Sequence, residues 1–169
     1  MWEEVVMRGI RSTSRVGLRP VLAVALVSVL ALVASACSKS ASTTPSYDVF
    51  VQKFRFHNMP ATLSGGNIVI NFSNKESDTI THEMVLIQLP SGKTSDDVIA
   101  DAKAGGTDSE DEWLHFGEIG EVDTSATKSG LFDLPAGTYA LACWQTGNLG
   151  GGKGSPHAAR GMVFQFTVT

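Results

Sequence analysis

The sequence is short of cysteine, of positive charge and of long apolar runs. Its 169 residues hold two cysteines, Cys37 and Cys143, and 13 basic against 17 acidic side chains, a formal net charge of −4. Two cysteines are too few for a disulfide-stapled scaffold, and an acidic chain has no electrostatic reason to bind nucleic acid. The run Val21–Ala34 is uncharged but holds only 14 residues. A helix that spans a bilayer needs roughly 18–20.

The first 37 residues have the organisation of an export signal. Four arginines precede the apolar run, and the small residues Ala34, Ser35 and Ala36 lead directly to Cys37. A basic segment, a short apolar core and a small-residue end are typical of a secretory signal peptide. The end of the run also resembles the lipobox of bacterial lipoproteins, in which the cysteine is lipidated and becomes the first residue of the mature chain.

We therefore expect a signal peptide at residues 1–37 with lipid on Cys37, a disordered tether at 38–47, and one domain at 48–169. The exported, membrane-attached domain would face the periplasm or the exterior. Two alternatives are cleavage after the Ala-Ser-Ala sequence, which frees the protein, and an uncleaved helix. Residues 38–169 hold 9 basic and 15 acidic side chains. In that domain Cys143 is alone, so we expect it to be buried, joined to another chain or bound to a metal.

The region from 48 to 169 has the pattern of an all-β protein. Short alternating runs are separated by Gly, Pro and Asn, which predicts a β-sandwich. The expected strands lie within 49–56, 67–74, 82–89, 131–143 and 162–168. Residues 95–106 instead predict a short helix in a connection between strands. Ten acidic residues lie between Asp96 and Asp123, and we interpret this stretch as a solvated insertion or as a docking patch for a basic partner.

Four residues near expected strand ends have the donor types of a blue-copper site. Cys143 ends one strand, Met162 begins the last one, and His157 lies on the segment that returns between them. His82 opens the run 82–89. One thiolate, two imidazoles and one thioether form the ligand set of a trigonal site with a long axial methionine. Spacing alone leaves open whether His82 reaches the same end of the sandwich.

The domain resembles the cupredoxins, the family of plastocyanin-like and pseudoazurin-like blue-copper proteins. The resemblance is most specific in PAGTYALAC, in the spacing of His157 and Met162, and in the final strand; NFSNKESDTITHEMVL places the first histidine at His82. It implies a Greek-key β-sandwich with one copper ion, held by His82, Cys143, His157 and Met162, and single-electron transfer rather than substrate conversion. The implied partners are exported or membrane-bound redox proteins that dock transiently onto a monomer.

Two features depart from the small carriers of this family. Thirteen residues separate Cys143 from His157, and the residue after the first histidine is Glu83 in place of an amide. The same residues would also serve copper capture and delivery without redox turnover, and a cupredoxin-like domain without metal would serve as an interaction module. A weaker hypothesis is a Cu(I) site of His57 and Met59. We expect His115, which is close to Trp113 in the sequence, to be a packed or surface histidine.

Overall fold

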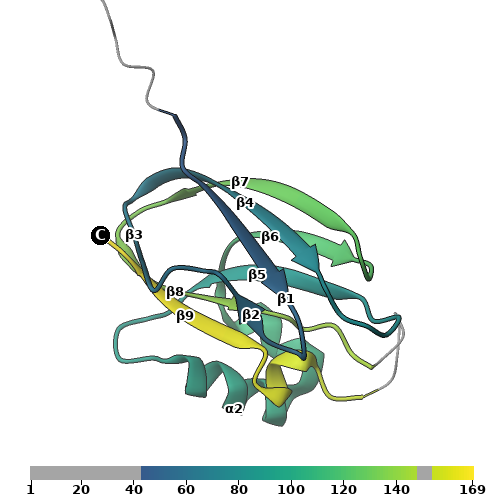
Figure 1. Cartoon of the computed structure of the whole chain (residues 1–169). Coiled ribbons are helices and arrows are strands. Elements are labelled where there is room, and N and C mark those ends of the chain that lie inside the picture. The colour runs from purple at the N-terminus through teal and green to yellow at the C-terminus, as the bar shows by residue number, and fades with distance from the viewer. Residues whose placement is uncertain (1–42, 148–153) are drawn as a thin grey trace, which may run out of the picture. The chain divides into compact units, whose positions relative to one another are not determined.

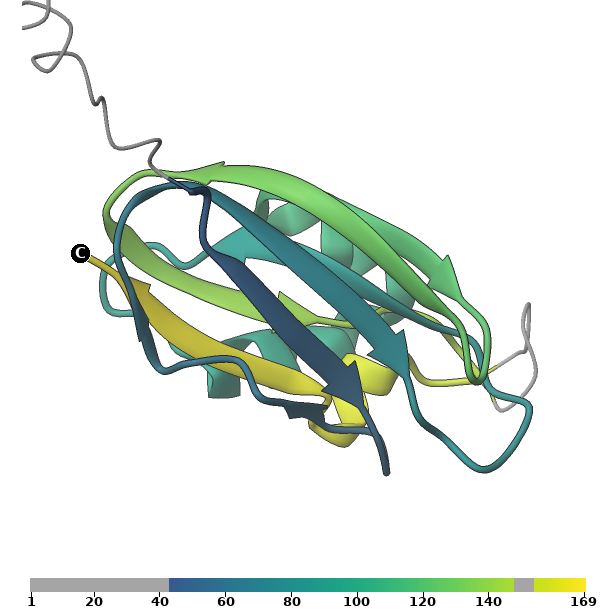
Figure 2. The same ribbon diagram turned by 45° about the horizontal axis from the view of Figure 1, so that its top comes forward.

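Two β-sheets face each other in residues 43–147 and 154–169, which are the residues that the computed structural model describes (Figures 1 and 2). The first sheet has the order β2-β1-β4-β7. Its strands are β1 (Ser46–Val51), β2 (Phe56–His57), β4 (Gly66–Asn74) and β7 (Thr127–Leu134). The second sheet has the order β3-β9-β8-β5-β6. Its strands are β3 (Thr62–Leu63), β5 (His82–Gln88), β6 (Leu114–Val122), β8 (Gly137–Ala142) and β9 (Val163–Val168).

The core between the sheets follows from the period of two in the strands. In β4, Ile68, Ile70 and Phe72 are buried while the residues between them are not. From the second sheet, Met84 and Leu86 of β5 are buried in the same cluster. The chain changes sheets at β2–β3, β3–β4, β4–β5, β6–β7 and β7–β8. The expectation of an all-β Greek-key sandwich with one short helix is confirmed.

The first expected strand is divided in two. The run 49–56 alternates in apolar character, but β1 ends at Val51 and a tight turn leads into β2. Gln52 and Arg55 exchange backbone hydrogen bonds of 3.1 and 3.2 Å across that turn. At its other end β1 begins two residues before the expected domain start, because Ser46 and Tyr47 pair with β4. The compact unit spans Thr43–Thr169, so Cys37 and the expected signal peptide lie outside the described residues.

The acidic stretch is not a solvated insertion. It forms α2 (Ser95–Gly105), a 3₁₀ turn η1 (Gly106–Glu112) and β6, an integral strand of the second sheet. Val98, Ala102 and Trp113 are buried in a second core, against the outward-facing residues of β5 and β8. The sequence interpretation failed because a few apolar residues, widely spaced among acidic ones, are enough to cover one face of a sheet. No helix among the described residues combines the length and apolarity of a membrane span.

Candidate metal centre

Three of the four predicted donors meet at one end of the sandwich. β5 and β8 are antiparallel neighbours, with Val85 opposite Ala142, so the start of β5 lies beside the end of β8. This pairing brings His82, the first residue of β5, next to Cys143. His157 begins the 3₁₀ turn η2 (His157–Arg160), which is tied back to the strand end by a 2.7 Å hydrogen bond from the Ala158 N–H to the Cys143 carbonyl. The topology therefore settles the question that spacing left open for His82.

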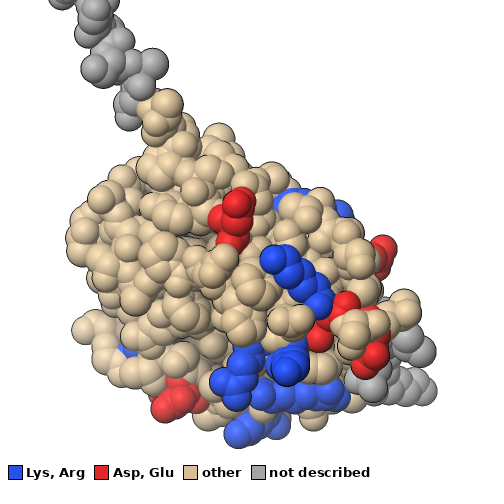
Figure 3. Space-filling view, in the orientation of Figure 1, with Lys and Arg blue, Asp and Glu red and all other residues tan. Residues whose placement is uncertain are grey.

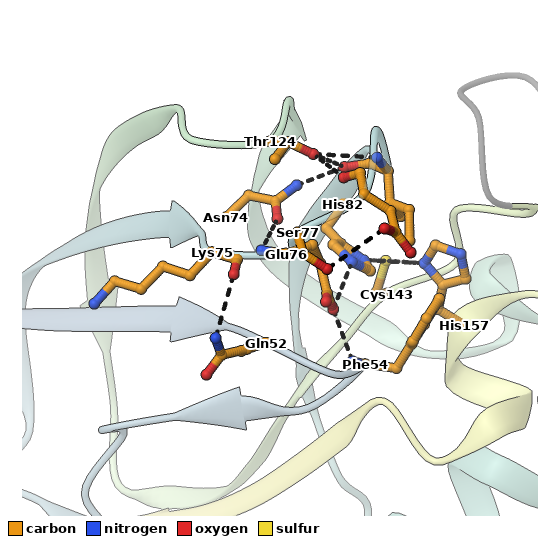
Figure 4. Close-up of polar contacts among 12 residues, drawn as sticks. Gln52, Phe54, Asn74, Lys75, Glu76, Ser77, His82, Thr124, Cys143 and His157 are labelled. Atoms are coloured by element: carbon orange, nitrogen blue, oxygen red, sulfur yellow. Dashed lines mark hydrogen bonds and ion pairs between the residues drawn. The ribbon is translucent and has the colours of Figure 1, made fainter.

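The three donor atoms form a small buried triangle (Figure 4). Nδ1 of His82 and Nδ1 of His157 are 3.0 Å apart, and Sγ of Cys143 lies 3.8 Å from the first and 3.4 Å from the second. All three residues are fully buried. The centre of a triangle with these sides lies about 2 Å from each atom, close to the length of metal–nitrogen and metal–thiolate bonds. The arrangement fits a metal ion without any rearrangement of the backbone.

Protonation also favours metal binding. Burial, together with the charge of the neighbouring His157, lowers the pKa of His82 to about 4, and burial lowers the pKa of His157 as well. Both imidazoles are therefore neutral at pH 7, and each keeps a lone pair for a metal. Burial raises the pKa of the Cys143 thiol. A cation at the centre of the triangle would oppose that effect, because it stabilises the thiolate.

His157 is held at both its backbone and its ring. Its N–H donates to the Gln145 carbonyl at 2.9 Å, and Thr146 pairs with Pro156 in an isolated β-bridge. Its Nε2–H donates to the carbonyl of Gly147 at 2.8 Å, which leaves Nδ1 as the lone-pair nitrogen. The thirteen-residue connection is therefore closed near its base, on the Cys143 side by Gln145–Gly147 and on the His157 side by Pro156. Residues 148–153 lie outside the described residues.

Comparison with known proteins finds similarity in structure only. No protein-family profile matches the chain, and no curated protein matches its sequence. The structure is similar to a dithionite-reduced auracyanin from the photosynthetic bacterium Roseiflexus castenholzii, with a TM-score of 0.51 and 15% identity over 75% of this chain and 98% of that one. It is similar to auracyanin B with a TM-score of 0.51 and 19% identity, over 74% of this chain and 88% of that one. Both are cupredoxins. This chain has the cupredoxin fold.

Glu83 ties the candidate site to the loop that follows Cys143. Its carboxylate accepts hydrogen bonds from the Trp144 N–H at 2.7 Å and from the side-chain amide of Gln145 at 3.0 Å. Its own N–H donates to Sγ of Cys143 at 3.5 Å. Burial raises the pKa of the Glu83 carboxyl. The residue that the sequence marked as a departure thus orients the cysteine loop, with a carboxylate in place of an amide.

Sequence reasoning missed two residues beside the site, Glu76 and Phe54. Oε1 of Glu76 accepts a 2.8 Å hydrogen bond from the Phe54 N–H and lies 3.4 Å from Nε2 of His82, where it orients the ring electrostatically rather than through a well-formed hydrogen bond. The Phe54 ring meets the His82 and His157 rings edge to face, at centroid distances of 5.4 and 4.8 Å. No sequence signal marks these roles, since both depend on the β1–β2 turn.

The remaining candidates differ in what the fold does with them. Met162 is fully buried in the same core cluster as Cys143, and its N–H donates to the His157 carbonyl at 3.1 Å. Its function as an axial ligand stays a prediction. Met59 is buried in the core, whereas Nε2 of His57 donates to the Gln52 carbonyl and the His57 ring stacks on Phe50. These contacts provide other partners for both members of the alternative His57–Met59 pair.

Proposed function

We propose that this domain binds one copper ion in a type 1 site and carries single electrons at the cell envelope. The observation that carries the proposal is the buried triangle of one thiol and two imidazole nitrogens, at the end of a sandwich with the cupredoxin fold. One thiolate with two imidazoles is the equatorial donor set of blue-copper sites, and Met162 is the proposed axial donor. Copper, when bound, supplies a one-electron couple.

The residues around the triangle orient its donors and stabilise the thiolate. The carbonyl of Gly147 fixes the tautomer of His157, and the Glu83 N–H donates to the cysteine sulfur, where a hydrogen bond stabilises thiolate charge. Because the donors are held by strand ends and a short 3₁₀ turn, little reorganisation is expected when the charge at the site changes. Complete burial of the donors leaves no open side for a substrate. These features favour an electron carrier over an enzyme.

The visible spectrum tests the copper proposal. Addition of Cu(II) to the purified protein should give intense blue or green thiolate-to-copper absorption, because that transition requires a short copper–sulfur bond. Cys143→Ser should abolish the band even where His82 and His157 retain some copper. Cys37→Ser is the matched control, since it removes the other cysteine and should leave the band unchanged. A wild-type protein that binds neither Cu(I) nor Cu(II) specifically would leave a metal-free interaction module.

Two further variants separate the functions of the donors. Met162→Leu should keep the colour and raise the reduction potential, because an axial thioether tunes the site more than it holds it. His157→Gly should open the site to water or added imidazole, with partial return of the band when imidazole is supplied. Reversible one-electron cycling supports the carrier. Tight Cu(I) binding without a stable coloured Cu(II) form would instead indicate copper capture and delivery.

The proposed place of the protein is the outer side of a membrane. Support comes from the sequence, in which a basic segment and a 14-residue apolar run lead to Ala-Ser-Ala-Cys37. Lipid on Cys37 would attach the domain to the membrane through a short tether. The domain would act as a monomer and bind exported or membrane-bound redox proteins transiently. Intact mass and detergent partitioning of the cell-derived protein test this. A water-soluble product that starts at an unmodified Cys37, or an uncleaved chain, would contradict it.

A further inference from the structure

The turn between β1 and β2 places a half-buried aromatic ring directly over the candidate metal centre. Phe54 contacts both site imidazoles, at 5.4 and 4.8 Å between ring centroids, while His82 and His157 themselves are fully buried. Phe54 retains partial exposure. The turn thus links solvent to the two imidazoles through one side chain, and Glu76 fixes it there by accepting the Phe54 N–H (Figure 4).

The backbone of this turn is costly for the residues it holds. Lys53 and Phe54 have φ angles of 53° and 56°, in the left-handed region that glycine and asparagine favour. A side chain other than glycine costs roughly 1 kcal/mol or more at such a position. Two-residue hairpin turns of this kind usually hold Asn-Gly or Asp-Gly. The turn therefore holds two residues in a backbone conformation that they do not favour, at the place where Phe54 covers the site. Backbone strain of this kind is concentrated at functional positions.

Exposed cations flank Phe54 in the sequence, and another lies next to its ring in space. Lys53 and Arg55 flank Phe54 and are exposed, and the exposed Arg160 of η2 places its guanidinium 5.4 Å from the centre of the Phe54 ring. Among the described residues none of these three cations has an acidic partner within salt-bridge distance. Figure 3 shows Lys and Arg side chains gathered where β2 and η2 lie in Figure 1. This concentration is unexpected in a chain of net charge −4.

We propose that Lys53, Phe54, Arg55 and Arg160 form a docking surface, here named the basic cap, for the acidic face of a redox protein. The inference rests on the proposed electron-transfer function and names the chemistry of its partner. Unpaired cations raise the rate of association with an acidic surface and repel basic surfaces, and the Phe54 ring offers an apolar contact. Small, weak interfaces of this type suit a transient redox encounter.

The position of the basic cap favours a protein over an anionic membrane. The chain enters the described domain at Thr43, next to the start of β1, whereas the basic cap lies past the other end of that strand. A domain attached through its N-terminus can therefore present the basic cap away from the attachment point. The cap is also next to the site donors, which a protein partner must approach for electron transfer and a lipid surface need not.

The test uses one haem protein in two charge states. Cytochrome c with succinylated lysines supplies an acidic surface, and unmodified cytochrome c supplies a basic one with the same haem. The first measurement needs no copper: isotope-labelled, metal-free full chain in neutral detergent is titrated with each cytochrome at low salt. We expect amide shifts at residues 53–55 and 160 with the succinylated form, lost at high ionic strength, and none with the basic form. Absence of these shifts would overturn the proposal.

The second measurement is the rate at which the copper-loaded, reduced chain reduces each ferric cytochrome. One electron passes from the protein to the haem iron, which becomes ferrous, and no bond or proton is exchanged. Lys53→Glu with Arg55→Glu should slow the reaction with the succinylated cytochrome by at least about tenfold at low salt. Lys53→Gln with Arg55→Gln should give an intermediate rate. Lys93→Glu with Lys103→Glu, one just before α2 and one within it, changes net charge equally and should alter the rate by less than about twofold.

The outcomes distinguish the docking surface from the function beneath it. Colour and cycling in the wild type, with equal rates for cap and control variants, overturn the basic cap and leave the copper proposal standing. Shifts at the cap in a protein that forms no coloured copper site support docking and overturn electron transfer. Binding to phosphatidylglycerol vesicles without a response to succinylated cytochrome would show that the cap recognises lipid, and the protein-partner proposal would be wrong.

Discussion

The metal-site end of the domain and the acidic layer of α2 and η1 are both built from connections between strands, yet they are stabilised in opposite ways. At the site, buried polar atoms converge and are fixed by specific hydrogen bonds, as for His157 and Gly147. In the acidic layer, a few apolar side chains such as Val98 and Trp113 pack on the sheet beneath a charged exterior. A metal site requires particular donor atoms at fixed positions, whereas a layer that covers a sheet requires only enough buried apolar surface.

The two regions meet at Trp144, the residue after Cys143. Its backbone N–H donates to Glu83 and its indole N–H donates to the hydroxyl of Ser109, at 2.7 and 3.1 Å. The acidic layer therefore supports the loop that follows Cys143, although it supplies none of the three candidate metal-binding atoms. This division leads to four predictions. Stability should depend most on the cover, and the site should respond most to the bonds between the two regions.

The largest expected loss of stability comes from the cover. Trp113→Ala removes a side chain that is 8% exposed in the second core, and loss of a buried aromatic costs about 3–5 kcal/mol. Because Trp113 does not contact the donors, the visible band of the copper-loaded protein should persist below the unfolding transition. Urea denaturation measures the loss. Glu112→Ala, at an exposed neighbour, should change stability by less than about 0.5 kcal/mol. Equal effects would mean that the layer is indeed a solvated insertion.

The next effect concerns the loop that precedes His82. The buried side-chain amide of Asn74 donates to the carbonyls of Ile80 and Val122, at 2.6 and 2.9 Å, and its oxygen accepts the Glu76 N–H. Asn74→Ala removes all three hydrogen bonds, although the Ile80 carbonyl keeps one from the Thr124 hydroxyl at 3.2 Å, and we expect a cost of about 2–4 kcal/mol. Copper affinity should fall as well, since Glu76 would lose its position. Asn71→Ala, whose contacts are exposed, is the control for denaturation and for metal titration. Unchanged affinity would show that the loop is held without Asn74.

A smaller effect tests the bond between the two regions. Ser109→Ala removes the acceptor of the buried Trp144 indole and should cost about 1–2 kcal/mol. Its thermal unfolding is compared with that of Ser129→Ala, which removes an exposed hydroxyl bonded to Asn71. We also expect a shifted visible band in Ser109→Ala only, because Trp144 follows the thiol residue. An unshifted band would mean that Glu83 alone fixes the cysteine loop.

The site was more predictable from sequence than the parts that support it. Histidine and cysteine are rare in this chain, so His82, Cys143 and His157 could be recognised as candidate ligands from residue type alone. The expected strand boundaries then predicted that Cys143 and His157 lie near one end of the sandwich. The stretch that holds Val98 and Trp113 was interpreted as a solvated insertion, because sparse apolar residues among acidic ones carry no clear period. The turn at Lys53 and Phe54 was read as strand, since two left-handed residues other than glycine contradict local preference. Tertiary contacts with Glu76 and the imidazoles hold that turn, and neither is visible in the local sequence.

The smallest expected effect is a dependence on pH that involves Glu83, the carboxylate shared by the site and the cysteine loop. Burial raises the pKa of its carboxyl above the ordinary value of 4.5. Between that value and the raised pKa, the folded state binds a proton that the unfolded state has released. The free energy of unfolding contributed by Glu83 should therefore fall as pH rises through this interval and level off above the folded-state pKa. Glu83→Gln has no such proton.

Urea denaturation of metal-free wild type and Glu83→Gln from pH 4 to 8 measures this dependence as the difference between the two stabilities. That difference should decline with pH, and Glu121→Gln, which removes a charge from the exposed surface of β6, corrects for the change in net charge. A difference that instead grows with pH would mean that the hydrogen bonds from Trp144 and Gln145 stabilise the carboxylate more than burial destabilises it. Glu83 would then stabilise the fold through specific hydrogen bonds, as the other polar groups of the site do. The contrast with the acidic layer, which is stabilised by apolar packing, would be stronger.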